Sequence, residues 1–236
     1  MIDAAPIEVA VRESYVGDCE ILMTYGTGHA IRRPWWMKHL ARGGRCVGWD
    51  LGYWQHEEGT MRLTLDADHP QRWIRDEPAA RWDACRIELR EDFSADGPVV
   101  IVGLGKKALK VHGLAPLQWE RGAAARVANL GRKLVFRPKR STDARLKGVA
   151  IGMGEIEEVL RGASLVVCRH SNVAIDACIA GVPVICEDGA ALALYQRGQA
   201  PTTEQRLQFL RNLAWWQWKP NEAKEAWTYL LSRLSA

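Results

Sequence analysis

The sequence predicts an α/β protein built from two halves with parallel strands, and three segments carry that prediction. Residues 19–50 read as strand, Gly-containing turn, helix and strand, the pattern of a βαβ unit with a right-handed crossover. Val99–Gly103 is a wholly apolar run, as in strands that are covered on both faces. Residues 163–186 repeat the order strand, turn, helix and strand.

The N-terminal unit begins with a strand at Cys19–Thr24, followed by a helix at Pro34–Ala41 and a strand at Arg45–Asp50. A proline near the first turn suits the start of that helix, and two glycines suit its end. The glycine pair Gly26-x-Gly28 lacks the third glycine of the dinucleotide fingerprint. We therefore do not expect a nicotinamide dinucleotide to bind there.

The middle of the chain is less regular. Residues 55–64 give only a weak signal, whereas Arg86–Arg90 alternates charged and apolar residues, as a half-exposed strand does. After the apolar run at 99–103, a helix is expected over Trp119–Leu130 and a strand over Lys133–Lys139. These elements continue the alternation of strands and helices that is typical of an α/β fold.

The most informative stretch predicts a strand at Ser164–Cys168, a polar turn at residues 169–172 and a helix at Val173–Ala180. Ser171 or Asn172 can cap this helix, and its first N–H groups are then expected to face an anion. A strand-to-helix turn of this kind lies at the carboxyl edge of a parallel sheet, where α/β folds bind ligands. Thr203 is expected to cap a further helix, and a last helix is expected from residue 220 onward.

Composition sets limits on the class of protein. The 236 residues are 47% hydrophobic and 25% charged, with a net charge of +4, which is ordinary for a globular protein. No apolar run is long enough for a membrane span, and the N-terminus lacks the regions of a signal peptide. The six scattered cysteines favour reduced thiols in a cytoplasmic protein over zinc ligands or disulfides. Most of the eleven tryptophans are expected in the core, although a Trp-rich surface could stack bases or sugars.

The motif His170-Ser-Asn-x3-Asp-x4-Gly-x-Pro-x-Ile resembles the C-terminal signature of glycosyltransferases with the GT-B fold. UDP-sugar 2-epimerases and glycerophosphate transferases share it. The resemblance covers roughly residues 132–190. It implies two Rossmann-like halves that face a cleft: an acceptor half at residues 1–118 and a donor-binding half at residues 119–236. The last helix, at about 220–236, would pack back on the N-terminal half. Such enzymes are usually longer than this chain.

The resemblance also implies a donor site. In these families the His/Ser turn contacts the donor diphosphate, and an acidic residue five positions after the Ser holds the ribose; here that residue is Asp176, in place of the more usual Glu. Related enzymes often carry Arg-Pro-His-Pro after the preceding strand, where this chain has Arg-Pro-Lys-Arg. The expected donor-binding residues are Arg137, Lys139, His170, Ser171, Asn172 and Asp176. The co-substrate would be a nucleotide-sugar, expected to be UDP-linked, with no metal or other cofactor.

Two further sets of residues are candidates. Gly103, Gly105, Lys106 and Lys107 follow a buried strand and could contact phosphate or nucleic acid, or the lysines could simply be solvated. An inverting enzyme needs a general base, for which Asp50 and His29 are candidates. Asp50 is preferred because it closes a strand, and a turn or cap residue is the alternative. His39, His56 and His112 lie in no motif and are expected to be ordinary histidines.

The acceptor is the least determined feature. This compact chain, with Gly26-Thr-Gly-His and a terminal Trp215-Trp-Gln-Trp-Lys-Pro region, resembles bacteriophage and prophage proteins. Phages glycosylate hydroxymethylated bases in DNA, which must be flipped out of the duplex. We therefore predict a glycosyltransferase that modifies phage DNA in the host cytoplasm. The alternatives are a surface-polysaccharide or lipid-linked acceptor, a UDP-sugar epimerase-like enzyme, or a non-catalytic module that binds nucleic acid or nucleotides.

Overall fold

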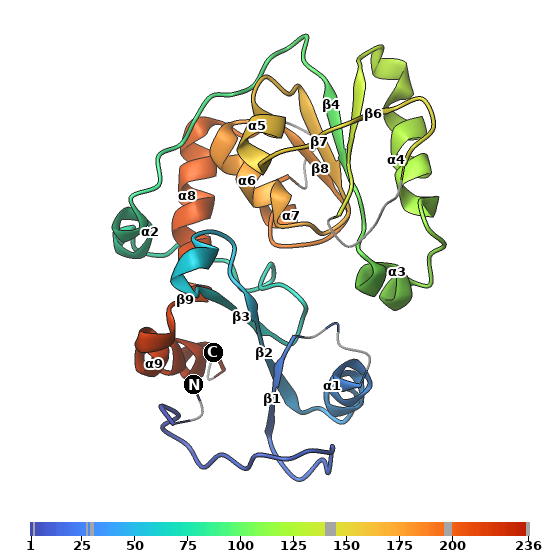
Figure 1. The fold of residues 1–236 in the computed structure, drawn as a ribbon. Coiled ribbons are helices and arrows are strands. Elements are labelled where there is room, and N and C mark those ends of the chain that lie inside the picture. The colour runs from blue at the N-terminus through green and yellow to red at the C-terminus, as the bar shows by residue number, and fades with distance from the viewer. Residues whose placement is uncertain (2, 27, 29–30, 140–144, 196–199, 235–236) are drawn as a thin grey trace. The chain divides into compact units, whose positions relative to one another are not determined.

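The computed structural model describes residues 1, 3–26, 28, 31–139, 145–195 and 200–234. The chain forms two compact units: unit 1 contains Met1–Ala84 and Leu210–Ala236, and unit 2 contains Cys85–Phe209 (Figure 1). The boundary predicted after residue 118 thus falls inside unit 2. In the described part of the chain, no helix is both long and apolar enough to cross a membrane.

Unit 1 is built on a mixed sheet with the strand order β1-β2-β3-β9. Its strands are β1 (Ile21–Tyr25), β2 (Arg45–Leu51), β3 (Met61–Leu65) and β9 (Gln217–Trp218). The β1–β2 pair is parallel and is connected through helix α1 (Arg32–Ala41), which confirms the predicted βαβ unit. The β2–β3 and β3–β9 pairs are antiparallel, so this half is not a purely parallel sheet. Strand β3 lies in the stretch where the sequence signal was weak.

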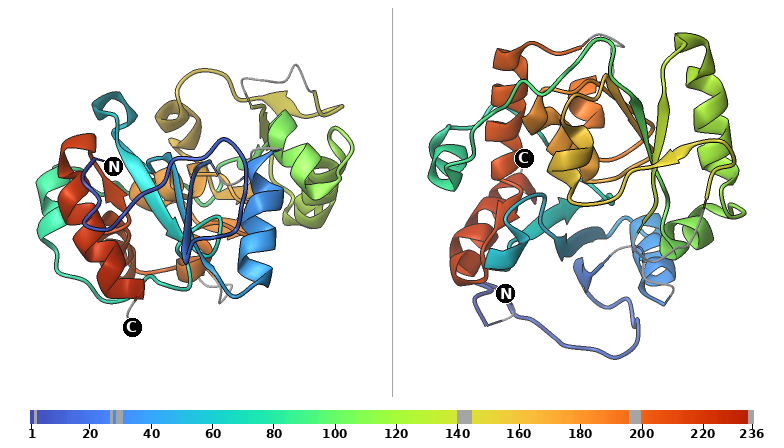
Figure 2. Two further views of the ribbon diagram at one scale, coloured as in Figure 1. Left: turned by 90° about the horizontal axis from the view of Figure 1, so that it is seen from below. Right: turned by 45° about the horizontal axis from the view of Figure 1, so that its top comes forward.

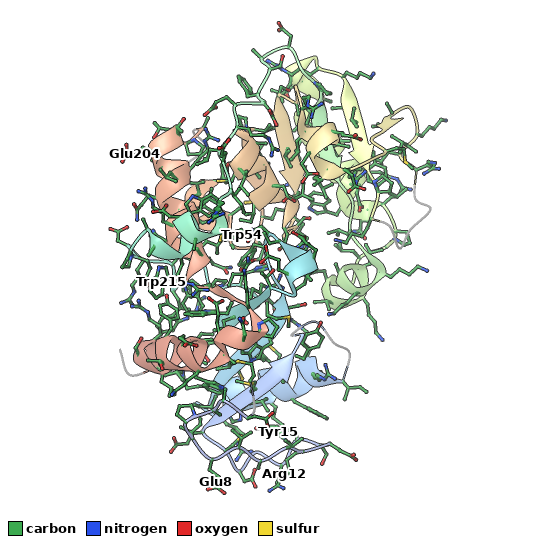
Figure 3. All side chains as sticks on the ribbon, turned by 60° about the vertical axis from the view of Figure 1, so that its left-hand side comes forward. Glu8, Arg12, Tyr15, Trp54, Glu204 and Trp215 are labelled. Carbon is green, nitrogen blue, oxygen red and sulfur yellow. The ribbon has the colours of Figure 1, made fainter. Side chains whose placement is uncertain are left out.

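The remaining helices of unit 1 surround an aromatic core. They are the 3-10 helix η1 (His56–Glu58), α2 (Ala80–Cys85), the 3-10 helix η3 (Pro220–Glu222) and α9 (Ala223–Leu234). Trp54 and Trp215, which Figure 3 labels, belong to this core. Trp54 packs edge-to-face on Trp82, and Trp215 packs on Tyr229 of α9. The Trp227 indole nitrogen donates to the Met1 carbonyl oxygen at 2.8 Å, so Met1 lies against α9 (Figure 2).

Unit 2 contains a five-stranded, wholly parallel sheet with the order β6-β5-β4-β7-β8. Its strands are β4 (Val99–Val102), β5 (Leu134–Arg137), β6 (Ala150–Ile151), β7 (Leu165–Cys168) and β8 (Val184–Cys186). Strand β4 pairs with both β5 and β7 and is therefore the central strand. This pairing explains why unit 2 begins well before residue 118.

Helices cover both faces of the parallel sheet. They are α3 (Lys106–His112), α4 (Gln118–Val127), the 3-10 helix η2 (Ala128–Leu130), α5 (Ile156–Leu160), α6 (Val173–Ala180), α7 (Leu192–Tyr195) and α8 (Thr203–Ala214). Val99 and Ile101 of β4 pack with Trp119 and Ala123 of α4 in one apolar cluster. All four β4 residues are buried, as the continuous apolar run predicts.

Two local predictions are corrected by the structure. Residues 86–90 form no strand; instead the Arg90 N–H donates to the Ile179 carbonyl oxygen, and Arg86 has a positive φ of 53°. Helix α8 is capped by Thr202 rather than Thr203. The Gln205 N–H donates to the Thr202 hydroxyl, and the Gln205 side chain accepts from the Thr202 N–H, which together make a capping box.

Arg206 connects helix α8 to the rest of unit 2. Its guanidinium donates to the carbonyl oxygens of Arg90 and Cys178, and it also forms an ion pair with Glu91. The side chain is only 4% exposed, so its removal leaves buried carbonyl oxygens without a charged partner. We expect Arg206→Ala to lower the free energy of unfolding by about 3 kcal/mol, as measured by urea denaturation.

The control is Arg161→Ala, which changes an exposed arginine of the same unit. Its expected effect lies within about 0.5 kcal/mol. Equal midpoints for the two variants would show that the buried contacts of Arg206 contribute little.

Candidate functional site

The segments that follow four strands of unit 2 lie at one edge of the parallel sheet, because parallel strands end on the same side. These segments are residues 103–107 after β4, 138–139 after β5, 169–172 after β7 and 187–189 after β8. They contain all of the predicted donor-binding residues except Arg137, the last residue of β5, and Asp176, which lies on α6. The strands thus bring these candidate residues to the same edge.

The ends of β4 and β5 are tied together by backbone contacts. The Gly103 N–H donates to the Arg137 carbonyl oxygen at 2.8 Å, and a Cβ on Gly103 would lie 3.0 Å from the Phe136 ring. A side chain at Gly103 would therefore crowd the sheet. The Arg137 guanidinium donates to the Gly152 carbonyl oxygen at 3.2 Å. The segment that begins at Gly103 is therefore held against the end of β5, just before Lys139.

Three exposed lysines follow strands β4 and β5 at this edge of the sheet. Gly105 precedes α3 in an extended conformation, and Lys106 and Lys107 are the exposed first residues of that helix. Lys139 is also exposed. Ammonium groups on this edge can balance the charge of a phosphate ligand.

The start of α6 agrees with the prediction in its cap but differs in its first N–H groups. Ser171 caps the helix, because its hydroxyl accepts from the Val173 N–H at 3.3 Å, and Asn172 makes no side-chain cap. The Ala174 and Ile175 N–H groups donate to the carbonyl oxygens of Ser171 and Asn172. The first N–H groups of this helix are thus already bonded within the turn. An anion at this edge would be bound mainly by side chains.

The backbone at His170 packs against the turn that follows β8. Gly189 has a φ of +97°, a conformation that favours glycine, and a Cβ on it would lie 3.3 Å from the His170 Cα atom. The neighbouring N–H groups of Glu187 and Asp188 both donate to the Arg169 carbonyl oxygen. These contacts fix the backbone on which the imidazole is placed.

Arg169 and Glu187 belong to this edge although no motif indicated them. Glu187 accepts hydrogen bonds from the Trp119 indole at 2.8 Å, from Arg126 at 2.8 Å and from Arg169 at 3.1 Å. Burial acts to raise the pKa of Glu187, but these hydrogen bonds and the two arginine charges outweigh it and lower the pKa. Glu187 is therefore an anchor that orients Arg169.

Asp176 lies on α6 in an unusual electrostatic environment. Burial raises the pKa of its carboxyl group to about 7, and the nearby Glu157 carboxylate adds to the effect. The positive charges of Arg90 and Lys139 oppose it.

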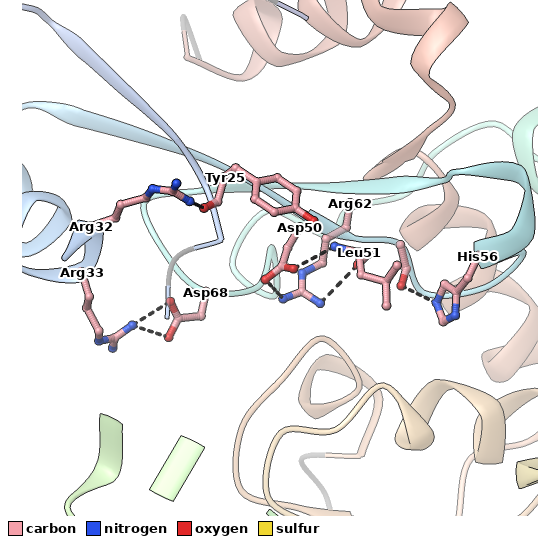
Figure 4. A network of polar contacts seen from close by, with 9 residues as sticks. Tyr25, Arg32, Arg33, Asp50, Leu51, His56, Arg62 and Asp68 are labelled. Atoms are coloured by element: carbon pink, nitrogen blue, oxygen red, sulfur yellow. Dashed lines mark hydrogen bonds and ion pairs between the residues drawn. The ribbon is translucent and has the colours of Figure 1, made fainter. Parts of the chain in front are cut away.

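The other candidate residues lie in unit 1. Asp50, near the end of β2, forms an ion pair with Arg62 at 3.2 Å and accepts the Leu51 N–H at 2.8 Å (Figure 4). Nearby, Arg33 donates to both carboxylate oxygens of Asp68 at 2.9 Å. His29, the other candidate base, lies outside the described residues.

The structure confirms the expectation that most of the tryptophans lie in the core. Of the eleven tryptophans, eight are buried, and Trp35, Trp73 and Trp215 are half-buried. The buried ones are Trp36, Trp49, Trp54, Trp82, Trp119, Trp216, Trp218 and Trp227. These rings contribute mainly to the core and do not form an exposed platform for stacking bases.

No family model matches this sequence, and no curated protein matches it. Several solved structures match it in fold, two of them over most of the chain. The Thermosulfurimonas dismutans KpsC β-Kdo 2,4 transferase is 12% identical with a TM-score of 0.58, and the match covers 97% of this chain and 90% of that one. The β-Kdo 2,7 transferase of the same KpsC is 13% identical with a TM-score of 0.53, covering 89% and 85%. The chain therefore has a GT-B-like α/β fold, with one wholly parallel five-stranded sheet.

Proposed function

We propose that this protein is a glycosyltransferase that moves a sugar from a nucleotide-sugar bound at unit 2 to a hydroxyl acceptor. The main support is the carboxyl edge of the parallel sheet, where Lys139 follows β5, and Arg169 and His170 follow β7 just before α6. The GT-B-like fold agrees with this reading.

Each residue then has a chemical role. The cations Arg137, Lys139 and Arg169 balance the negative charge that develops on the departing phosphate. His170 contacts the phosphate from the turn after β7, and Asp176 accepts a hydrogen bond from a ribose hydroxyl. Asp50 of unit 1 accepts the proton of the acceptor hydroxyl.

For the acceptor, we propose a surface polysaccharide or a lipid-linked glycan in preference to DNA. A site for the DNA backbone would leave arginines available for phosphates. Near Asp50, however, Arg33 and Arg62 are each paired with a carboxylate. The burial of most tryptophans also leaves few indole rings on which bases could stack. The two similar structures are named as Kdo transferases, so nucleotide-activated Kdo is the first donor to test beside UDP-sugars.

A thermal-shift screen against UDP, CMP, CDP, GDP and ADP and their sugars tests the donor site. A ligand at about 100 times its Kd should stabilise the protein by about 2.7 kcal/mol. We expect one nucleotide to give such a shift and His170→Ala to abolish it, because the imidazole contacts the phosphate.

His56→Ala is the matched control. This histidine of unit 1, labelled in Figure 4, is exposed. Its Nε2 atom lies 2.8 Å from the carbonyl oxygen of Gly52, four residues earlier in the chain. The control variant should keep the full nucleotide shift. If no nucleotide stabilises the wild-type protein, the proposed donor site is wrong.

A further inference from the structure

His112 lies at the edge of the sheet described above, although no sequence motif includes it. It is the last residue of α3, and Gly113 ends that helix in the left-handed conformation. The C-terminal end of α3 lies beside the residues that follow β7, where Arg169 Nη2 is 3.3 Å from His112 Nδ1. Residues 57 positions apart in the chain are joined by this contact.

The contact with Arg169 defines the tautomer of His112. A guanidinium has only N–H donors and stays protonated, so the Nδ1 atom that faces it must be an acceptor. The imidazole is then neutral and carries its proton on Nε2. Arg169 is itself oriented by Glu187, which also binds Trp119 and Arg126. A chain of fixed contacts thus runs from α4 to the His112 ring.

His112 also lies beside His170. The two ring centroids are 5.5 Å apart, with the planes inclined at 53°. Because the first N–H groups of α6 are bonded within their own turn, a phosphate at this edge needs side-chain donors. A neutral imidazole with a fixed Nε2–H provides one such donor, and the guanidinium beside it provides the positive charge.

We propose that His112 is a second phosphate-binding imidazole of the donor site, and that Arg169 holds it as the neutral Nε2–H tautomer. In this arrangement one phosphate group is contacted by His112 and His170 together. This inference rests on the proposed function, because it assigns the same site a further binding residue.

Two substitutions separate ligand binding from a purely structural role. His112→Asn keeps an acceptor in the place of Nδ1 for Arg169 but removes the Nε2–H donor. His112→Gln places an N–H donor near the Nε2 position but removes the Nδ1 acceptor. The probe is inorganic pyrophosphate, with Kd measured by calorimetry and the histidine tautomers measured by nitrogen NMR on the whole chain.

We expect the wild-type spectrum to show an unprotonated Nδ1 on His112, and pyrophosphate to perturb His112 and His170 together. His112→Asn should weaken pyrophosphate binding about tenfold without lowering the unfolding temperature, and His112→Gln should bind within about threefold of wild type.

Other results overturn the inference in distinguishable ways. If His112→Asn binds like wild type while His112→Gln loses stability, His112 only ties α3 to Arg169. If pyrophosphate perturbs His170 but not His112, the donor site stands and the role of His112 does not. If the wild-type protein binds neither pyrophosphate nor any nucleotide, the donor site and this role are both wrong.

Discussion

Replacing Asp50 with asparagine is expected to lower kcat by about 10²- to 10⁴-fold while leaving KM for the donor nearly unchanged. The asparagine keeps the size of the side chain and an oxygen that can accept the Leu51 N–H. It removes the group that would take the acceptor proton. Donor binding is assigned to unit 2, so the loss should fall on the chemical step.

The ion pair with Arg62 requires a matched control. Arg62 is only 11% exposed on its side chain, and Asp50→Asn leaves it without its counter-charge. Asp68→Asn removes the carboxylate partner of Arg33 in the same unit, with a similar exposure of the acidic side chain. We expect Asp68→Asn to keep activity within a few-fold and to cost about 1 kcal/mol or less.

The measurement is initial-rate kinetics with the nucleotide-sugar that the thermal-shift screen identifies, together with urea unfolding of both variants. If Asp50→Asn keeps activity within threefold of wild type, Asp50 is not the proton acceptor and His29 becomes the candidate. A loss shared equally by Asp68→Asn would instead point to a general weakening of unit 1.

The sequence predicted unit 2 well because its elements are determined locally. The runs at Val99–Val102 and Leu165–Cys168 are apolar without interruption, and α6 ends at the predicted glycine. Gly181 has a φ of +74°, so the turn needs a residue that tolerates this conformation. Such signals lie within a few residues of each other, so they can be recognised in the sequence without knowledge of tertiary contacts.

The structure of unit 1 was harder to predict because it depends on distant pairing. Strand β3 alternates apolar and polar residues over only five positions, Met61–Leu65, and it is held between β2 and the two-residue strand β9. The pairing of Met61 with Trp218 joins residues that are far apart in the sequence. Unit 2 has one such failure, because residues 86–90 also have a strand-like pattern but find no partner strand. Partner strands, not the local pattern, decided both outcomes.

The candidate site was predictable only in part. The motif identified the turn with His170 and Ser171, because strand ends at a parallel sheet edge collect ligand-binding residues. It did not identify His112 or Glu187, which reach Arg169 from separate elements. It also predicted free N–H groups at α6, whereas the Ser171 hydroxyl and local carbonyl oxygens occupy them. Side-chain networks between elements leave no local signal in one sequence.

Asp176→Asn should change how stability depends on pH. An aspartate in an unfolded chain has a pKa of about 4, whereas burial raises the pKa of Asp176 to about 7 in the folded protein. Between these two values the folded protein keeps a proton that the unfolded chain has lost. The free energy of unfolding therefore decreases as the pH rises from 4 to 7, by roughly 2–4 kcal/mol, and changes little from this group above pH 7.

The asparagine variant has no such proton, so it should lack this slope and be more stable than wild type at pH 8 by a similar amount. Urea unfolding between pH 4 and pH 8 measures the difference. Glu157→Gln is the control, because removing that neighbouring charge should lower the pKa of Asp176. The stability of this variant should therefore depend on pH less steeply than that of the wild-type protein. Parallel curves for wild type and Asp176→Asn would contradict the burial argument.

If Asp176 also holds the ribose, the stabilised variant should bind nucleotide about tenfold more weakly, since a neutral amide accepts hydrogen bonds less strongly than a carboxylate. A gain in stability with a loss of binding is the pattern expected of a residue retained for its ligand and not for the fold.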